Sequence, residues 1–177
     1  MPIQHINDRI LKAMNRKITK KEIISLISRI RKRIPSGVIR TSVIVGFPGE
    51  GKKEFRELLG FLKEIKFERL GAFLYSREEG TPAYNFFPQV HQRTKEKRFN
   101  EVMELQKDIA QEVNSRFIGQ NLDVLVETKA DNTFIGRTQY DALEVDGVVF
   151  LKKKNLKPGD FCKTNIIDAY AYDLVGA

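Results

Sequence analysis

The residues best suited to bind a ligand lie in the turn 46–53, GFPGEGKK, between an apolar run and an amphipathic one. Its spacing comes close to the phosphate-binding loop GxxxxGK(S/T), in which backbone amides cradle phosphates and a hydroxyl binds magnesium. Lys53 stands where that hydroxyl should be, and Pro48 lacks an amide hydrogen. A nucleotide site is therefore a remote alternative. We interpret the turn as a strand-to-helix connection at the carboxyl end of a strand, where α/β folds bind small molecules.

Helices and strands alternate around this turn. Residues 2–6 resemble the end of a strand, and Asn7 is a good cap for the helix that follows. Thr19 and Glu22 predict a capping box before an apolar helical stripe. The remaining elements expected here are a strand at 38–45, a helix through 55–65 and a strand at 70–75. This order indicates an α/β fold with parallel strands.

The pattern of apolar residues changes in the second half of the chain. Residues 77–93 predict a loop, and Thr94 opens a long helix. Short alternating strands are expected at 122–127, 133–140, 147–151 and 161–169, with Asn132 among the turn residues. Such strands indicate a small closed barrel of the OB type. The expected domains are an incomplete α/β part at 1–93, a connecting helix at 94–117 and an all-β barrel at 118–177.

The α/β part offers too few strands for a complete sheet. Two full strands and the end of a third leave apolar edges uncovered, and parallel strands need cover on both faces. We therefore expect the sequence to begin in the middle of a domain.

Composition excludes several classes of protein. The single cysteine, Cys162, excludes an internal disulfide framework and fits a reducing cytoplasm, which is the expected location. One cysteine and two histidines cannot form a tetrahedral metal site without many carboxylates, so no metal ligands are expected. No apolar run approaches the roughly 20 residues of a membrane span, so no membrane contact is expected.

The net charge of +8 is unevenly distributed. Residues 1–117 hold 24 Lys+Arg and 14 Asp+Glu, whereas residues 118–177 hold 7 and 9. The basic part would suit RNA or phosphate, or it forms ordinary solvated helix surfaces, because no exposed aromatic residues are interleaved with its charges.

Three stretches carry a resemblance to a known family: PIQHINDRILKAMNR, IRTSVIVGFPGE and EFRELLGFLKEIKFERLGAFLYSREEGTPA. Together they resemble the second half of the radical S-adenosylmethionine (SAM) methylthiotransferases. That family couples a TIM-like radical SAM barrel to a terminal TRAM domain, which is an OB-like barrel. The resemblance implies a partial α/β radical SAM barrel in residues 1–93 and a TRAM domain in residues 118–177.

Two branches of this family differ in substrate. The MiaB-like branch modifies an adenosine of transfer RNA, and the RimO-like branch modifies an aspartate of a small-subunit ribosomal protein. Residues 4–5 (QH), 40–42 (RTS) and 78–81 (EEGT) resemble the RimO-like branch. Residues 141–147, DALEVDG, are similar to its DAPEIDG signature, with Leu143 replacing proline. A slightly acidic barrel also suits a basic ribosomal protein better than RNA, so we expect the RimO-like substrate and keep the MiaB-like one as the alternative.

The resemblance implies a transfer of a methylthio group to the β-carbon of the aspartate by hydrogen abstraction. The family uses SAM and 4Fe-4S clusters, one held by a CxxxCxxC loop and another by three more cysteines. This sequence has neither set, so we expect no catalytic or metal-ligating residues here and an inactive fragment whose partner is the missing amino-terminal part of the enzyme. A non-catalytic module that binds a ribosomal protein or RNA is the alternative.

Five residues are expected to contact SAM by this resemblance. Ile44 matches an aliphatic residue beside the adenine, and Gly46 permits close approach of the backbone. Arg40 and Gln4 are expected to hydrogen-bond the methionyl carboxylate or the ribose. Tyr75 ends the next strand on the same side. For Arg40 a surface position at a strand end, and for Tyr75 a packing role, are open alternatives.

Three other residues have structural interpretations. His5 matches the RimO-like signature, and we interpret it as a hydrogen-bonded structural histidine. Glu50 is expected to stabilise the following helix through its dipole. Cys162 is expected to be a buried or half-buried strand residue.

Overall fold

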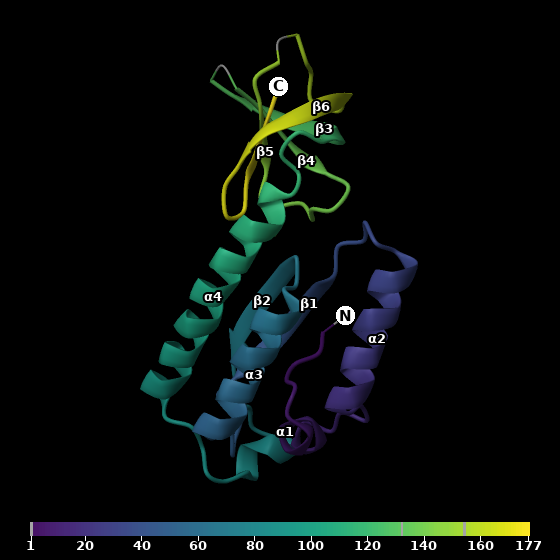
Figure 1. Cartoon of the computed structure of the whole chain (residues 1–177). Coiled ribbons are helices and arrows are strands. Elements are labelled where there is room, and N and C mark those ends of the chain that lie inside the picture. The colour runs from purple at the N-terminus through teal and green to yellow at the C-terminus, as the bar shows by residue number, and fades with distance from the viewer. Residues whose placement is uncertain (1, 132, 154) are drawn as a thin grey trace. The chain divides into compact units, whose positions relative to one another are not determined.

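The computed structural model describes residues 2–131, 133–153 and 155–177, so Asn132, expected in a turn, lies outside the described residues. The chain divides into two compact units, Met1–Gln106 and Lys107–Ala177. Each unit has its own hydrophobic core, and Figure 1 shows the helices and strands of both.

The first unit is built on two parallel strands. Its elements are α1 (Asp8–Ala13), α2 (Lys20–Arg33), β1 (Arg40–Val45), α3 (Lys52–Ile65), β2 (Arg69–Leu74), the short 3-10 helix η1 (Pro82–Asn85) and the first part of α4 (Gln92–Ser115). Gln4 adds a parallel bridge beside β1: its amide donates to the Ser42 carbonyl at 3.0 Å, and its carbonyl accepts from the Ile44 amide at 2.8 Å. The expected end of a third strand is thus present.

Local capping explains where the first helices begin. The Asn7 side chain accepts a hydrogen bond from the Ile10 amide at the start of α1. Thr19 and Glu22 exchange side-chain and backbone hydrogen bonds at the start of α2, as the capping-box pattern predicts.

The two faces of β1 have different surroundings. Thr41, Val43 and Val45 are buried, whereas the alternating residues are half-buried. The buried face packs in a core that includes Ile27 of α2 and Leu58 of α3. On the other face of the sheet, Phe73 of β2 is 58% exposed. Parallel sheets normally bury both faces. Within the described residues, by contrast, this sheet is covered on one side only.

The second unit is a closed five-stranded barrel, which confirms the expected OB-like architecture. Its strands are β3 (Asn121–Ala130), β4 (Thr133–Thr138), β5 (Val149–Leu151), β6 (Phe161–Ala169) and β7 (Leu174–Gly176), in the order β3-β4-β5-β7-β6 around the barrel. The inward residues of these strands form its core, among them Val124, Leu151 and Ile166. The sequence did not predict β7, a three-residue strand that pairs in parallel with β5.

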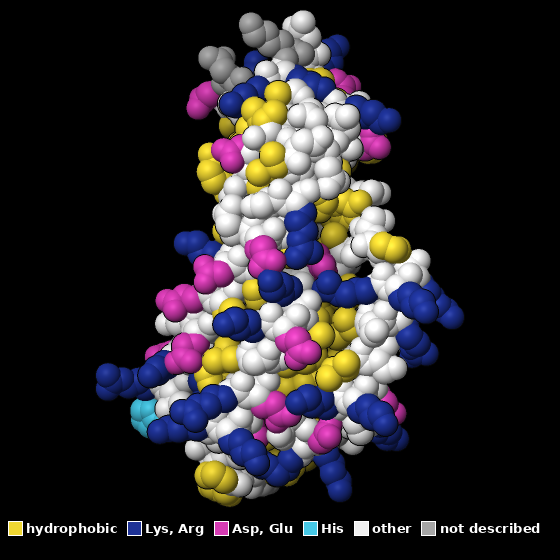
Figure 2. All heavy atoms as spheres, viewed as in Figure 1, with side chains coloured by type: hydrophobic (Ala, Val, Ile, Leu, Met, Phe, Trp, Pro, Cys, Tyr) yellow, Lys and Arg dark blue, Asp and Glu magenta, His cyan; other side chains and the backbone are white. Residues whose placement is uncertain are grey.

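Charged side chains cover much of the visible surface. On the face shown in Figure 2, Lys and Arg side chains on the first unit are interleaved with Asp and Glu and do not form one continuous basic patch. This pattern agrees with solvated helix surfaces. Among the described residues, no helix has the length and apolarity that a membrane span requires.

Candidate ligand pocket

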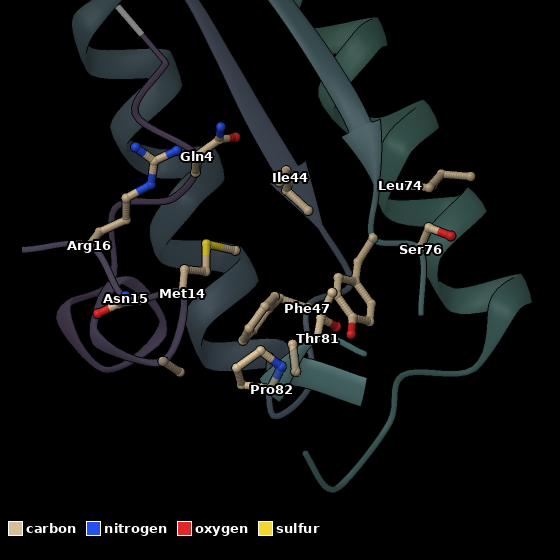
Figure 3. Close-up of a pocket in the computed structure, with 13 residues that line it drawn as sticks. Gln4, Met14, Asn15, Arg16, Ile44, Phe47, Leu74, Ser76, Thr81 and Pro82 are labelled. Carbon is tan, nitrogen blue, oxygen red and sulfur yellow. The ribbon is translucent and has the colours of Figure 1, made fainter. Parts of the chain in front are cut away.

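A cavity of about 440 Å³ lies at the carboxyl ends of β1 and β2. This is the position at which parallel α/β folds bind ligands. Its lining comes from the segment before α1, the end of α1, both strands and the loop that leads into η1 (Figure 3). The lining residues are Gln4, Ala13, Met14, Asn15, Arg16, Ile44, Phe47, Leu74, Tyr75, Ser76, Thr81, Pro82 and Ala83.

Two polar atoms of this lining are buried without a hydrogen-bond partner in the described part of the chain. They are the side-chain oxygen of Gln4 and the hydroxyl of Tyr75. An unsatisfied buried polar atom costs about 1–3 kcal/mol. Gln4 also has a left-handed backbone, with φ at 64°, and such strain concentrates at ligand-binding positions. The two atoms therefore mark this cavity as a place where a ligand can complete the hydrogen bonding.

The rest of the lining is largely apolar. Ile44, Met14 and Phe47 contribute aliphatic and aromatic surface. The Phe47 ring packs edge-on against the Tyr75 ring, with centroids 5.1 Å apart, and burial raises the pKa of the Tyr75 hydroxyl. An apolar wall with a few fixed polar groups suits a flat heterocycle that carries a polar tail.

The structure brings three of the five expected SAM contacts together. Gln4, Ile44 and Tyr75 line the cavity. Arg40 and Gly46 do not belong to the lining. Arg40 begins β1, four residues before Ile44 and therefore roughly 13 Å along the strand.

Gly46 has a packing role that the sequence did not suggest. Its φ is +76°, and a Cβ at this position would collide with the Lys95 side chain. Lys95 is itself buried and donates from Nζ to the Tyr75 carbonyl at 2.8 Å, and burial lowers its pKa. The glycine thus admits a side chain of α4 beside the pocket.

Sequence reasoning missed the residues that follow α1. Met14, Asn15 and Arg16 all line the cavity, and Arg16 brings a positive charge to it. Figure 3 shows Arg16 beside Gln4. The available signal was their place at the end of the stretch PIQHINDRILKAMNR, which carried the family resemblance.

The turn after β1 does not offer its amides to a phosphate. The Gly46 amide donates to the Glu50 carboxylate at 2.8 Å, and the Gly49 amide donates to the Pro88 carbonyl at 2.8 Å. The Gly51 amide donates to Glu54 at 2.9 Å. A buried carboxylate thus occupies the place where a phosphate would need positive potential, which argues against the nucleotide-binding alternative.

Glu50 belongs to a buried polar group. Its carboxylate pairs with Arg98 of α4 at 2.9 Å, and the Nε2 of His5 lies 3.7 Å away. Burial raises the pKa of Glu50, and the Arg98 charge opposes that shift. His5 accepts the Asn7 amide at Nδ1, whereas its buried Nε2 has no hydrogen-bond partner among the described residues. Burial lowers the pKa of His5 to about 4, so the ring is neutral near pH 7.

The residues of this chain do not fit an iron–sulfur cluster. Cys162 is the single cysteine, and it is half-buried in β6 with Sγ 3.3 Å from the Thr164 hydroxyl. Residues 2–131, 133–153 and 155–177 hold no group of three His, Cys, Asp or Glu side chains able to bind a metal ion. A cluster with three thiolate ligands cannot be assembled from these donors.

Comparison with known proteins places two families along the chain. The model of the radical SAM superfamily matches residues 1–62, and the model of the TRAM domain matches residues 118–177. Three similar relatives, each named ribosomal protein uS12 methylthiotransferase RimO, come from Thermoanaerobacter, Caldanaerobacter subterraneus and Clostridioides difficile. They are 50%, 48% and 47% identical over 99% of this chain. The chain spans about 40% of the length of these curated relatives.

Proposed function

The chain belongs to the RimO-like radical SAM proteins, and from this membership we propose that it provides part of the SAM site and the substrate-binding TRAM unit of a uS12 methylthiotransferase. The proposed reaction adds a methylthio group to the β-carbon of an aspartate in that ribosomal protein. We propose that it takes place in the cytoplasm.

The pocket with its two unpaired polar atoms is the observation that supports a SAM site. SAM joins a flat adenine to a ribose and a charged amino acid. Ile44 and Phe47 offer the apolar surface for the adenine, and Gln4 and Tyr75 offer hydrogen bonds. Arg16 supplies a charge for the methionyl carboxylate. In this role Arg16 replaces Arg40, whereas Gly46 acts through the packing of Lys95.

When bound in this family, SAM supplies the group that abstracts the hydrogen atom. The residues of this chain hold and orient SAM, and we propose that cysteines outside these 177 residues hold the clusters. On this proposal the chain binds SAM by itself but does not turn over. A non-catalytic module that only binds a ribosomal protein or RNA would not turn over either, but it would not bind SAM, so SAM binding separates the two candidate functions.

We propose that the barrel of the second unit recognises uS12. Residues 118–177 hold 9 Asp+Glu and 7 Lys+Arg. Proteins that grip RNA neutralise phosphates with cations, whereas an excess of carboxylates attracts a basic ribosomal protein. This balance favours the protein substrate over the transfer RNA of the MiaB-like alternative.

Isothermal titration of the full chain with SAM tests the proposed site. Tyr75→Phe removes one hydrogen-bonding group from the pocket, so we expect the Kd for SAM to rise about tenfold. Tyr84→Phe is the matched control, since Tyr84 stacks on Arg77 outside the lining, and it should leave the Kd unchanged. Equal affinities of wild type and Tyr75→Phe, or ATP binding that is lost in Lys52→Ala, would contradict the proposal.

A further inference from the structure

Two loops of the barrel expose large apolar and aromatic side chains. Leu143 and Val145, between β4 and β5, are 56% and 72% exposed. Tyr170 and Tyr172, between β6 and β7, are 54% and 43% exposed. Single exposed hydrophobic residues are common on protein surfaces, whereas groups of them on adjoining segments mark interaction sites.

The two loops adjoin one another. The Val148 amide donates to the Asp173 carboxylate at 2.9 Å, and the Leu174 amide donates to the Val148 carbonyl at 2.9 Å. Gly147 lies so close to the Tyr172 carbonyl that a Cβ would collide with it. Residues 141–147 and 170–173 therefore form one surface, which we call the loop surface.

Hydrogen bonds fix the shape of the loop surface. The Asp141 carboxylate accepts from the Thr138 hydroxyl at 2.6 Å, and the Asp146 carboxylate accepts from the Ala142 amide at 2.7 Å. The Tyr170 amide donates to the Asp173 carbonyl at 2.7 Å. A surface held in this way loses little conformational entropy on binding, so its apolar side chains are preorganised for a partner.

The charges of the loop surface have one sign. Its eleven residues include four carboxylates, on Asp141, Glu144, Asp146 and Asp173, and no Lys or Arg. Glu144 is exposed between Leu143 and Val145. The guanidinium of the neighbouring Arg137 is paired with Glu127 at 2.6 Å. Asp141 itself is buried, and Arg137 also donates to its carbonyl at 3.3 Å. The accessible negative charge next to the apolar side chains therefore comes from the exposed Glu144 and the half-buried Asp146 and Asp173, and it attracts a basic partner and repels phosphates.

We propose that the loop surface docks a basic segment of the substrate protein that also carries apolar side chains. The apolar side chains of the segment cover Leu143 and Val145, and its Lys or Arg side chains pair with Glu144 and its neighbours. This proposal rests on the proposed function, which names uS12 as the substrate. It adds the surface that binds the substrate and the chemistry of the segment that it accepts.

The test measures binding of fluorescently labelled uS12 to the full chain by anisotropy. We expect the double variant Leu143→Ser, Val145→Ser to bind about tenfold more weakly or worse, because it removes apolar surface that the partner would bury. Phe161→Ser is the matched control, since Phe161 is 77% exposed on the same unit but outside the loop surface, and it should bind as wild type does. Glu144→Lys should weaken binding at low salt and flatten its salt dependence.

The possible outcomes distinguish a failure of the loop surface from a failure of the proposed function. If wild type binds uS12 and the double variant binds equally well, the loop surface is excluded while the proposed function stands. If wild type does not bind uS12, both proposals fail. If polyuridine RNA binds more tightly than uS12 and loses affinity in the same double variant, the docked partner is RNA and the inference is overturned. Circular dichroism checks that each variant keeps its fold.

Discussion

Three buried side chains, His5, Glu50 and Arg98, join segments that lie far apart in the sequence. Arg98 Nη1 donates to both the carbonyl and the carboxylate of Glu50 at 2.9 Å, and the His5 ring lies against the same carboxylate. These contacts hold the turn after β1 between the segment before α1 and helix α4. Gln4 and Phe47, which line the pocket, belong to two of these segments. The buried group therefore fixes the position of part of the pocket lining.

The buried neutral His5 predicts a loss of stability in acid. Its pKa is about 4 in the folded chain and 6.5 as its ordinary value. The unfolded chain therefore binds a proton before the folded chain does, and stability falls as the pH drops from about 6.5 towards 4, by about 3 kcal/mol. The raised pKa of Glu50 acts in the opposite sense, because protonation of that carboxyl in the folded chain relieves its burial.

Urea unfolding at pH 7 and pH 4.5 measures this loss. His5→Asn keeps an acceptor for the Asn7 amide and removes the titrating ring, so the difference between the two pH values should shrink. His91→Asn is the control, because His91 is exposed. An unchanged pH dependence in His5→Asn would show that other groups control the acid sensitivity.

Loss of the arginine from this group is expected to be severe. Arg98→Met leaves the Glu50 carboxyl buried without its cation, and breaking a buried pair in this way costs about 3–5 kcal/mol. Arg93→Met, at an exposed position of the same helix, is the control and should change the free energy of unfolding by less than about 0.5 kcal/mol. Urea unfolding at pH 7 compares the two variants, and similar stabilities would contradict the role given to Arg98.

At the residue level the sequence predicted the parts of the pocket that belong to motifs. Gln4, Ile44 and Tyr75 lie at strand ends, and strand ends can be located from the apolar pattern. The sequence did not predict Arg16 as a pocket residue. Its position depends on the left-handed backbone of Asn15, with φ at 57°, which turns the chain after α1 towards the cavity. The pairing of Glu50 with Arg98 spans 48 residues, and no local pattern encodes such a contact.

Among the elements, the β1–α3 turn depends most on a single backbone position. Gly46→Ala would place a methyl group against Lys95 on a backbone with φ at +76°. We expect a loss of about 1–3 kcal/mol in unfolding free energy, together with weaker SAM binding, because Lys95 also fixes the Tyr75 carbonyl.

A second glycine gives the matched control for this prediction. Gly60 lies inside α3 with open space where its Cβ would be. Gly60→Ala should therefore stabilise the chain by roughly 0.5–1 kcal/mol through helix propensity. Thermal unfolding compares both variants with wild type. Equal effects of the two substitutions would show that Gly46 has no special role in the turn.

The other elements were predictable to the extent that their signals are local. The caps at Asn7 and Thr19 located the first helices, and the strand at 161–169 is β6 itself. Helix α4 runs from Gln92 to Ser115, two residues earlier at each end than the expected 94–117. Strand β7 has three residues, too few for a periodic pattern, although one of its two partners, β6, ends only five residues earlier. Strands as short as this escape local analysis.

For the whole molecule, the two hydrophobic cores have no residue in common. The sequence predicted a change from helical stripes to alternating strands after Gly119, whereas the two compact units divide within α4, between Gln106 and Lys107. It also predicted that the α/β part would leave apolar surface uncovered. Phe73 of β2, 58% exposed on the uncovered face of the sheet, belongs to that surface, whereas Leu74, 36% exposed, lines the pocket. What the sequence did not encode locally is the order of strands around the barrel, which long-range pairing determines.

Separate cores predict separate responses to damage. Leu58→Ala empties part of the first core and Ile166→Ala part of the second, and each is expected to cost about 2–5 kcal/mol because both side chains are fully buried. Hydrogen exchange measured by mass spectrometry should then show faster exchange in β1 for the first variant and in β3 and β6 for the second. Exchange that accelerates equally in both units for either variant would mean that they unfold as one cooperative body. Separate responses would mean that SAM binding by the first unit survives damage to the barrel, so the two proposed binding activities can be measured independently in one chain.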